Sequence, residues 1–442
     1  MKLSVKLVNL MFIFVSSMAI ANDPFAELDD EMQHFEAQRA ESPKAKSEFE
    51  LFLKAEENDY QSWQKQYLKE FDQFQQQIIT KWGKVEPIKA EYDVEFNDNK
   101  EVKSVVDYEN DEIRVEILVN SSLSQADAEM AVKQEFKKLL NDQQSNLAKV
   151  FADTPLIDKG QVTISNVEFS EANKQQSKNI IIKQTQDQAQ QIDKKTDRAL
   201  LSDSAITEKE ATISAVEEKT ALIKNTQARI VNSESSYKKA QKNANNDNKI
   251  VSYKVKLPKN SLQKRARKYV TFAEKESKKN QIPAPLIMAI MHSESAFNPK
   301  AKSAVPAYGL MQIVPRTAGH DVNKLTRNID KPMAVRDLYV PEINVETGSA
   351  YLNILDKRYL KAIKDDQSRL YCTIAAYNTG AGNVARVFNK DGTRNINKAA
   401  KVINQLSAEQ VYQQLMAKLP YDETKHYLER VYSRIDLYQT KL

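Results

Sequence analysis

Residues 286–291 are six apolar residues without a charge, and this run constrains the fold of the chain more than any other stretch. Pro283 and Pro285 stand just before it, where the first turn of a helix tolerates proline. We therefore expect a helix that begins near Pro283. Because its next six residues are all apolar, that helix should be buried on nearly every side.

Glu294 follows this run, four residues after Ile290 and eight after Leu286, so it should share their inward face. Burial raises the pKa of a carboxyl group, and a carboxylic acid that stays protonated near neutral pH can protonate a leaving oxygen. Glu294 is also the only acidic residue between Ser277 and His320, so a pair of carboxylates is not available locally. The alternative is a glutamate at a helix end that turns to solvent.

A resemblance to a known family rests on three short motifs in order along the chain. They are Glu294-Ser295, Gly309-Leu310-Met311-Gln312 and Ala376-Tyr377-Asn378-Thr379-Gly380. In order and spacing they resemble the motifs of lytic transglycosylases with the goose-lysozyme-like catalytic fold. The resemblance runs from about residue 251 to the C-terminus. Within the family it is strongest to the murein transglycosylase C group, with a weaker match in the N-terminal half.

The resemblance implies an enzyme that cleaves the peptidoglycan glycan strand between N-acetylmuramic acid and N-acetylglucosamine. It implies that Glu294 is the catalytic acid and base. The substrate-binding residues that it implies are Ser303, Gln312, Tyr377, Asn378 and Tyr427. No cofactor is implied.

Taken without the resemblance, these polar residues have simpler interpretations. Gln312 follows Leu310-Met311 and can be a sugar-binding amide or a hydrogen-bonded structural residue. Tyr377 and Asn378 can form a ligand pair at the mouth of an apolar helix, or a packed tyrosine beside a helix C-cap.

The N-terminus has the pattern of an export signal over residues 1–21. A basic start, an apolar core and Ala19-Ile20-Ala21 match a cleavable signal peptide, which predicts a mature protein that begins at Asn22 in the periplasm. An uncleaved anchor is the alternative, and peripheral attachment to the outer membrane remains open. The murein transglycosylase C group consists of lipoproteins, but the single cysteine is Cys372, so no lipid anchor is expected here.

Composition argues against several other classes of function. One cysteine excludes an internal disulfide, and the four histidines are scattered without metal-ligand spacing, so no metal site is expected. The net charge of +5 is modest for 442 residues. No basic block interleaved with aromatic residues indicates nucleic-acid binding. The expected partners are peptidoglycan glycan strands, with cell-wall or division proteins as further candidates.

The pattern along the chain predicts three parts after the signal peptide. Residues 22–170 combine helical and alternating strand patterns and predict an α+β domain. Residues 171–250 are polar, lack glycine and proline, and predict a spacer that is a long helix, a weak coiled coil or a disordered segment. Residues 251–442 form the expected catalytic domain.

The expected fold class is therefore a mainly α, lysozyme-like catalytic domain at the C-terminus, preceded by a smaller α+β domain and the polar spacer. The leading hypothesis for function is a peptidoglycan lytic transglycosylase that leaves 1,6-anhydromuramic acid ends and serves cell-wall turnover. The alternatives are a goose-type hydrolase that adds water and a wall-binding module without catalysis.

Overall fold

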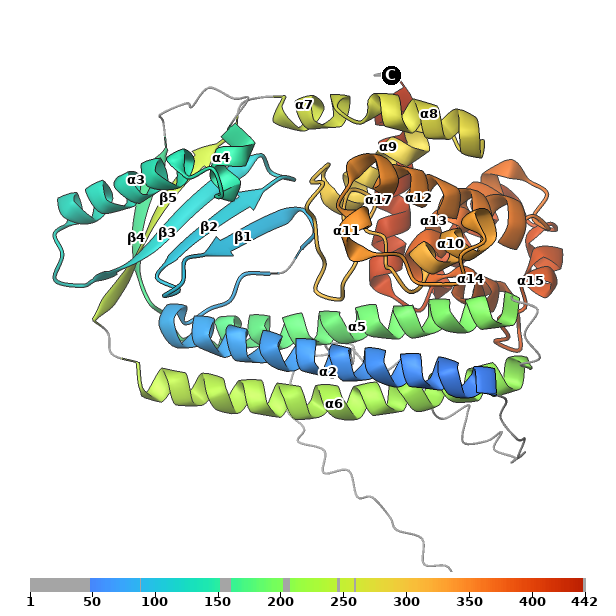
Figure 1. Ribbon diagram of the computed structural model, residues 1–442, viewed down its shortest axis with the longest axis horizontal. Helices are drawn as coiled ribbons and strands as arrows, with labels where there is room; N and C mark the ends of the chain where they lie inside the picture. Colours follow the sequence, from blue (N-terminus) through green and yellow to red (C-terminus); the bar gives the residue numbers. More distant parts are fainter. Residues whose placement is uncertain are drawn as a thin grey trace, which may run out of the picture. The chain divides into compact units, whose positions relative to one another are not determined.

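The computed structural model describes residues 48–87, 89–151, 160–201, 207–244, 247–257 and 260–439. The expected signal peptide and the expected mature N-terminus lie outside these residues. The described part of the chain contains a small antiparallel sheet, a set of three long helices and a larger helical domain (Figure 1).

The sheet has five antiparallel strands in the order β1-β2-β3-β5-β4. The strands are β1 (Tyr92–Phe96), β2 (Val102–Asp107), β3 (Glu112–Asn120), β4 (Gln161–Asn166) and β5 (Asn248–Lys256). Ile113 of β3 faces Val106 on one side and Val255 on the other, which places three branched apolar residues side by side in the core.

One face of the sheet is covered by α3 (Gln125–Asn141), with the short α4 (Asn146–Phe151) beside it (Figure 1). The Ser124 hydroxyl accepts a hydrogen bond from the backbone N–H of Asp127 and so caps the start of α3. Val132 and Phe136 then point into the core, and the Phe136 ring packs edge-on against Tyr253.

Three long helices pack against one another partly through buried polar side chains. They are α2 (Glu48–Trp82), α5 (Glu171–Leu201) and α6 (Glu208–Lys242), and α6 packs against both of the others. A small apolar core joins them to the sheet around Trp82, Ile180 and Tyr237. Further along, the helices meet through buried polar side chains, such as the hydrogen-bonded pair Thr185 and Thr226.

The residues expected as a polar spacer are therefore two packed helices between β4 and β5. Their polar composition favoured an exposed or disordered segment, but hydrogen bonds among buried polar groups take the place of apolar contacts here. The boundary expected at Val251 falls inside β5, and β5 pairs with β3 and β4. Residues 248–256 thus complete the sheet rather than begin the helical domain.

The rest of the described chain is mainly helical and surrounds the apolar helix that contains residues 286–291. Its helices are α7 (Ser261–Arg267), α8 (Val270–Asn280), α9 (Ala284–Ser295), α10 (Ala318–Arg327), α11 (Val335–Leu338), α12 (Pro341–Asn353) with a π-helical continuation (Ile354–Tyr359), α13 (Asp366–Thr379), α14 (Ala381–Phe388), α15 (Ile396–Ile403), α16 (Ala408–Lys418) and α17 (Asp422–Gln439). As expected, α9 is buried on nearly every side, with residues 286–291 at most 2% exposed. The mainly α domain after a smaller α+β region is confirmed.

Candidate active site

Glu294 lies in the last turn of α9 and is partly exposed, unlike the apolar residues before it. Its carboxylate oxygen Oε1 accepts a hydrogen bond of 2.7 Å from the hydroxyl of Tyr427 on α17. Burial raises the pKa of Glu294 to about 7, although the Tyr427 hydrogen bond and the charges of Lys194 and Arg430 lower it. A carboxyl group with such a pKa can both donate and accept a proton near neutral pH.

The end of α9 is fixed by Ser295, the residue after Glu294. The buried Ser295 hydroxyl donates to the carbonyl oxygens of Met291, one turn earlier, and Leu310, in the second motif. Ala296 and Phe297 then adopt left-handed backbone angles, with φ of 46° and 63°, so the helix stops just after the acid. The first two motifs are therefore held together through Ser295.

The second motif forms a tight loop around the side chain of Asn344. Asn344 is fully buried, donates to the carbonyl oxygens of Tyr308 and Leu338, and accepts from the backbone N–H of Met311. Gly309 has φ of 74°, and a Cβ atom there would lie 2.4 Å from the Asn344 amide nitrogen. Glycine is required at this position by both the backbone angle and the close approach.

Gln312 and Ser303 take part in the same loop structure. The Gln312 amide nitrogen donates to the carbonyl oxygens of Gly309 and Ala301, at 2.9 and 3.2 Å. The Ser303 hydroxyl donates to the carbonyl of Val305 and accepts from a backbone N–H. In this structure both side chains shape the loop, and their roles in sugar binding stay predictions.

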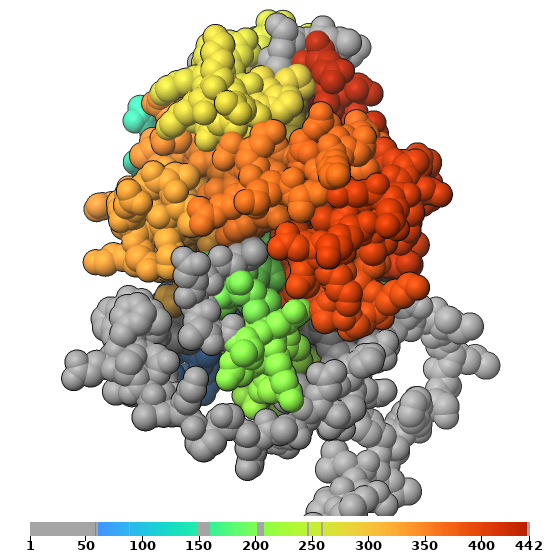
Figure 2. Space-filling model, turned by 90° about the vertical axis from the view of Figure 1, so that its right-hand side faces the viewer, coloured from blue at the N-terminus to red at the C-terminus, as the bar shows by residue number. Residues whose placement is uncertain are grey.

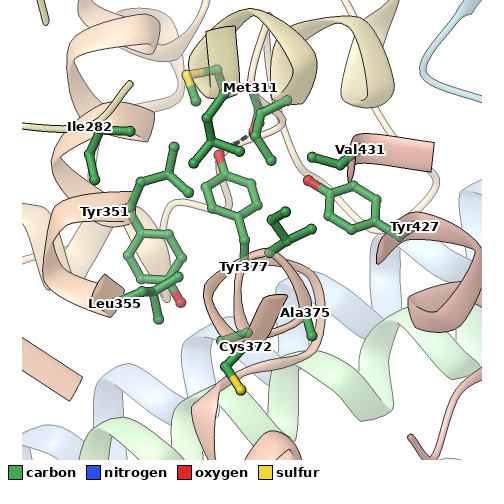
Figure 3. Close-up of a cluster of buried hydrophobic side chains, with 14 of the residues drawn as sticks. Ile282, Met311, Tyr351, Leu355, Cys372, Ala375, Tyr377, Tyr427 and Val431 are labelled. Atoms are coloured by element: carbon green, nitrogen blue, oxygen red, sulfur yellow. Dashed lines mark hydrogen bonds between the residues drawn. The ribbon is translucent and has the colours of Figure 1, made fainter. Parts of the chain in front are cut away.

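The third motif ends α13 beside the other two. Tyr377 donates to the carbonyl oxygen of Met311 at 2.8 Å. Figure 3 shows Tyr377 in one buried cluster with Tyr427, and Cys372 lies earlier in α13. Asn378 accepts a 2.6 Å hydrogen bond from Thr424 on α17. The helix continues through Thr379 and ends at Gly380, so Asn378 is not its C-cap residue.

The three motifs are thus joined by hydrogen bonds, and of the five residues expected to bind substrate, Tyr427 is the one that bonds directly to Glu294. Sequence reasoning missed Asn344, Lys194 and Glu423. Lys194 lies on α5 and donates to the carbonyl oxygen of Tyr377 at 2.8 Å. The negative charge of Glu423 acts to raise the pKa of Glu294, and Glu423 itself pairs with Lys183 at 2.8 Å.

The described residues contain no cluster of His, Cys, Asp and Glu side chains arranged to hold a metal ion. Cys372 is fully buried, and burial keeps the pKa of its thiol well above the ordinary value. A buried protonated thiol is a poor nucleophile. In the described part of the chain, no helix combines the length and the apolar composition of a membrane span.

Comparison with known proteins agrees with the motifs. Residues 271–400 match the family model of the transglycosylase SLT domain, so the expected resemblance is confirmed. A membrane-bound lytic murein transglycosylase C of Serratia proteamaculans is 45% identical over 193 residues, which are 44% of this chain and 52% of the relative. Its counterpart in Pectobacterium atrosepticum is 42% identical over 196 residues, 44% of this chain and 54% of the relative. The alignment with these curated relatives thus spans about half of their length.

Two solved structures are similar at lower identity. One is an inactive mutant of the lytic transglycosylase Slt of Pseudomonas aeruginosa, with 20% identity and a TM-score of 0.32 over 70% of this chain and 37% of that chain. The other is the 70 kDa soluble lytic transglycosylase of Escherichia coli, with 19% identity and a TM-score of 0.31 over 72% of this chain and 44% of that chain.

Proposed function

We propose that this chain is a peptidoglycan lytic transglycosylase that cleaves the β-1,4 bond between N-acetylmuramic acid and N-acetylglucosamine without adding water. The observation that carries the proposal is Glu294, an acid with a pKa raised to about 7, inside an SLT domain match and hydrogen-bonded to Tyr427. The names of the curated relatives, lytic murein transglycosylase C, support the same substrate class.

Glu294 serves two steps in the proposed reaction. In its protonated form it donates a proton to the departing glycosidic oxygen as the bond from that oxygen to the anomeric carbon breaks. As a carboxylate it then takes the proton from the C6 hydroxyl of the same muramic acid residue, whose oxygen closes on the anomeric carbon. The product has a 1,6-anhydromuramic acid end, and Glu294 is protonated again.

Intramolecular closure is favoured because the other carboxylates near the site interact with cationic side chains. A hydrolase usually needs a second carboxylate to activate water. Glu423 is paired with Lys183, and Asp321, whose charge acts on Lys194, lies 3.9 Å from the Arg198 guanidinium. The C6 hydroxyl is already held next to the anomeric carbon, so proximity favours it over a free water molecule.

A goose-type hydrolase is the second candidate, because the charge of Glu423 reaches Glu294. In that reaction Glu423 would leave Lys183 and act as the base for water. The two candidates differ in their products. The hydrolase leaves reducing muramic acid ends that contain an oxygen atom from water.

The test is mass spectrometry of the products from purified sacculi digested in oxygen-18 water. We expect 1,6-anhydromuramic acid ends without the label. Glu294→Gln should lose at least the ~10²–10⁴-fold that general acid and base catalysis supplies, with an unchanged circular dichroism spectrum. Labelled reducing ends would select the hydrolase, and a Glu294→Gln protein with wild-type activity would end both proposals.

We further propose that Ser303, Gln312, Tyr377, Asn378 and Tyr427 line the sugar site. The enzyme acts in the periplasm in cell-wall turnover. This location is supported by the signal pattern of residues 1–21.

A further inference from the structure

Helix α5 lies outside residues 271–400, the part of the chain that matches the SLT domain. It nevertheless contacts α13 and α14 of the helical domain. Its contacts with the helical domain are made by residues spread over about four turns. They are Lys183 to Glu423 on α17, Gln191 to Thr317 after the second motif, Lys194 to the Tyr377 carbonyl in the third motif, Asp197 to the Gly382 N–H on α14, and Arg198 to the Arg316 carbonyl. In Figure 2 the green surface of α5 and α6 adjoins the orange and red surface of the helical domain.

The docking of α5 is built on buried charges. Asp193 and Asp197 are at most 5% exposed, and both accept hydrogen bonds from Arg394. Asp197 also accepts from the Gly382 N–H at 2.7 Å, in space where a Cβ atom on Gly382 would lie 1.9 Å from its carboxylate. Separating these groups would leave unpaired charges in a buried interface, which is strongly unfavourable. Helix α5 is therefore firmly docked beside the proposed site.

Lys194 lies one turn before Asp197 and is the α5 residue whose charge acts on Glu294. Its ammonium donates to the Tyr377 carbonyl at 2.8 Å, next to the cluster that holds Tyr427. The charges of Lys194 and Glu294 act on one another: Lys194 lowers the pKa of Glu294, and Glu294 raises the pKa of Lys194. Burial lowers the pKa of Lys194 to about 8, so its ammonium is mostly charged at neutral pH.

The groups that act on Glu294 come from three helices. Tyr427, Arg430 and Glu423 lie on α17, Tyr377 on α13 and Lys194 on α5. Asp197, Asp321 and Glu423 also act on Lys194. Arg430 is the other cation that lowers the pKa of Glu294.

We propose that Lys194 is a positioning residue of the active site, supplied by α5 from outside the SLT domain, whose ammonium stabilises the Glu294 carboxylate formed when the acid gives up its proton. The inference rests on the proposed function. When the bond between the anomeric carbon and the leaving oxygen breaks, the Glu294 proton moves to that oxygen and leaves a negative charge on Glu294, which the Lys194 charge stabilises. When the C6 oxygen bonds to the anomeric carbon, the C6 hydroxyl proton returns to Glu294.

The test is the pH profile of kcat on purified peptidoglycan, across the range around the Glu294 pKa of about 7. The acid must be protonated, so activity falls as pH rises through that pKa. Removing the ammonium in Lys194→Met should raise the pKa of Glu294 and move this alkaline limb to higher pH by roughly 0.5–1 unit, with a several-fold lower kcat on the acid side. Lys194→Arg should restore the wild-type limb.

Two further variants separate charge from structure. Lys194→Gln keeps a hydrogen-bond donor for the Tyr377 carbonyl without the charge, so it should show the shifted limb even if Lys194→Met folds poorly. Lys195→Met removes the same charge one residue along, at a side chain paired with Glu218 on α6, and should keep the wild-type limb.

An unmoved limb in Lys194→Gln or Lys194→Met would overturn the inference. So would higher activity at every pH without a shift, because α5 would then be an inhibitory cover. Failure of the proposed function is visible separately, in the wild-type products and in Glu294→Gln. A wild-type hydrolase would leave the Lys194 test unchanged, since its acid would still be Glu294.

Discussion

At the scale of single residues, the site depends on one hydrogen bond that joins two distant helices. Tyr427 and Glu294 are 133 positions apart, and their side chains meet at 2.7 Å. Because the bond favours the carboxylate, it partly offsets the rise in pKa that burial causes. The bond also holds the carboxyl group in one orientation.

Tyr427→Phe should therefore change both the rate and the pH profile. We expect kcat to fall by about tenfold or more, the size of one hydrogen bond to a charged group. The alkaline limb of kcat should move to higher pH, because the Glu294 pKa loses a contribution that lowers it. Tyr432→Phe, at an exposed tyrosine on the same helix, is the control. A rate loss with an unmoved limb would mean that Tyr427 acts on the substrate alone.

His292 is a second residue whose environment predicts a pH effect, in this case on stability. Its ring is buried, stacks on Phe297 and is hydrogen-bonded to the Tyr438 hydroxyl at 3.0 Å. Burial lowers the His292 pKa to about 3, with Arg434 as the next cause. Below pH 6.5 the unfolded chain binds a proton at this residue that the folded chain does not, so folding stability falls as pH falls from 6.5 toward 3.

His292→Gln should remove this part of the pH dependence. The free energy of unfolding, from urea titrations at several pH values, should fall less steeply with acid than in the wild type, by up to about 1.4 kcal/mol per pH unit. His426→Gln, at an exposed histidine, controls for the loss of a histidine as such. Equal slopes in wild type and His292→Gln would mean that the folded protein protonates His292.

The sequence was sufficient for some of these residues and not for others. Glu294 was singled out because the motifs that follow it resemble those of a known family, since a glutamate at a helix end taken alone can simply turn to solvent. The loop roles of Gln312 and Ser303 depend on bonds to carbonyls two or three residues away, which require a turn geometry that the sequence pattern did not specify. Lys194 had no local signal, because its partner Tyr377 lies 183 positions away.

At the scale of elements, α5 and α6 show why a polar segment is difficult to interpret. Their few apolar residues predicted a long exposed helix, a weak coiled coil or a disordered segment. In the structure their polar residues are buried against partners far away in sequence, such as Asp193 against Arg394. Apolar periodicity marks a helix that packs through hydrophobic contacts, and it does not detect one that packs through paired charges.

Gly382→Ala tests the docking of α5. The added Cβ atom would lie 1.9 Å from the Asp197 carboxylate, so Asp197 must shift and weaken its bonds to Gly382 and Arg394. We expect a destabilisation of about 3 kcal/mol and faster amide hydrogen exchange in α5. Gly392→Ala is the control, because no atom lies within 4 Å of its Cβ position and only its φ of +67° resists alanine. Its cost should be about 1 kcal/mol, without faster exchange in α5. Unchanged exchange in Gly382→Ala would show that Asp197 does not hold α5.

At the scale of the whole molecule, the sheet is attached to the helix that carries the acid. The turn between β2 and β3 contains Glu109 and Asp111. Arg434 of α17 donates to Glu109 and to Ser293, the residue before Glu294. Arg265 of α7 donates to Asp111 at 3.0 Å and to the carbonyl of Ala296, two residues after the acid. The α+β region therefore braces the end of α9 from both sides of Glu294.

This brace predicts that the sheet and the helical domain unfold together. Scanning calorimetry of the wild type should show one cooperative transition. Replacing both arginines, in Arg265→Met/Arg434→Met, should remove about 1–3 kcal/mol of coupling and separate the transition into two. It should also lower kcat, because the end of α9 is then less firmly held.

The matched control removes two cations from within the helical domain. Lys275 and Lys279 form surface ion pairs with Glu342 and Glu346. Such exposed pairs contribute little, so Lys275→Met/Lys279→Met should keep one transition and change stability by less than about 1 kcal/mol. A single transition in the arginine double mutant, at a reduced temperature but with wild-type kcat, would mean that the sheet stabilises the molecule without bracing Glu294. Two transitions in the wild type would mean that the brace does not couple the domains at all.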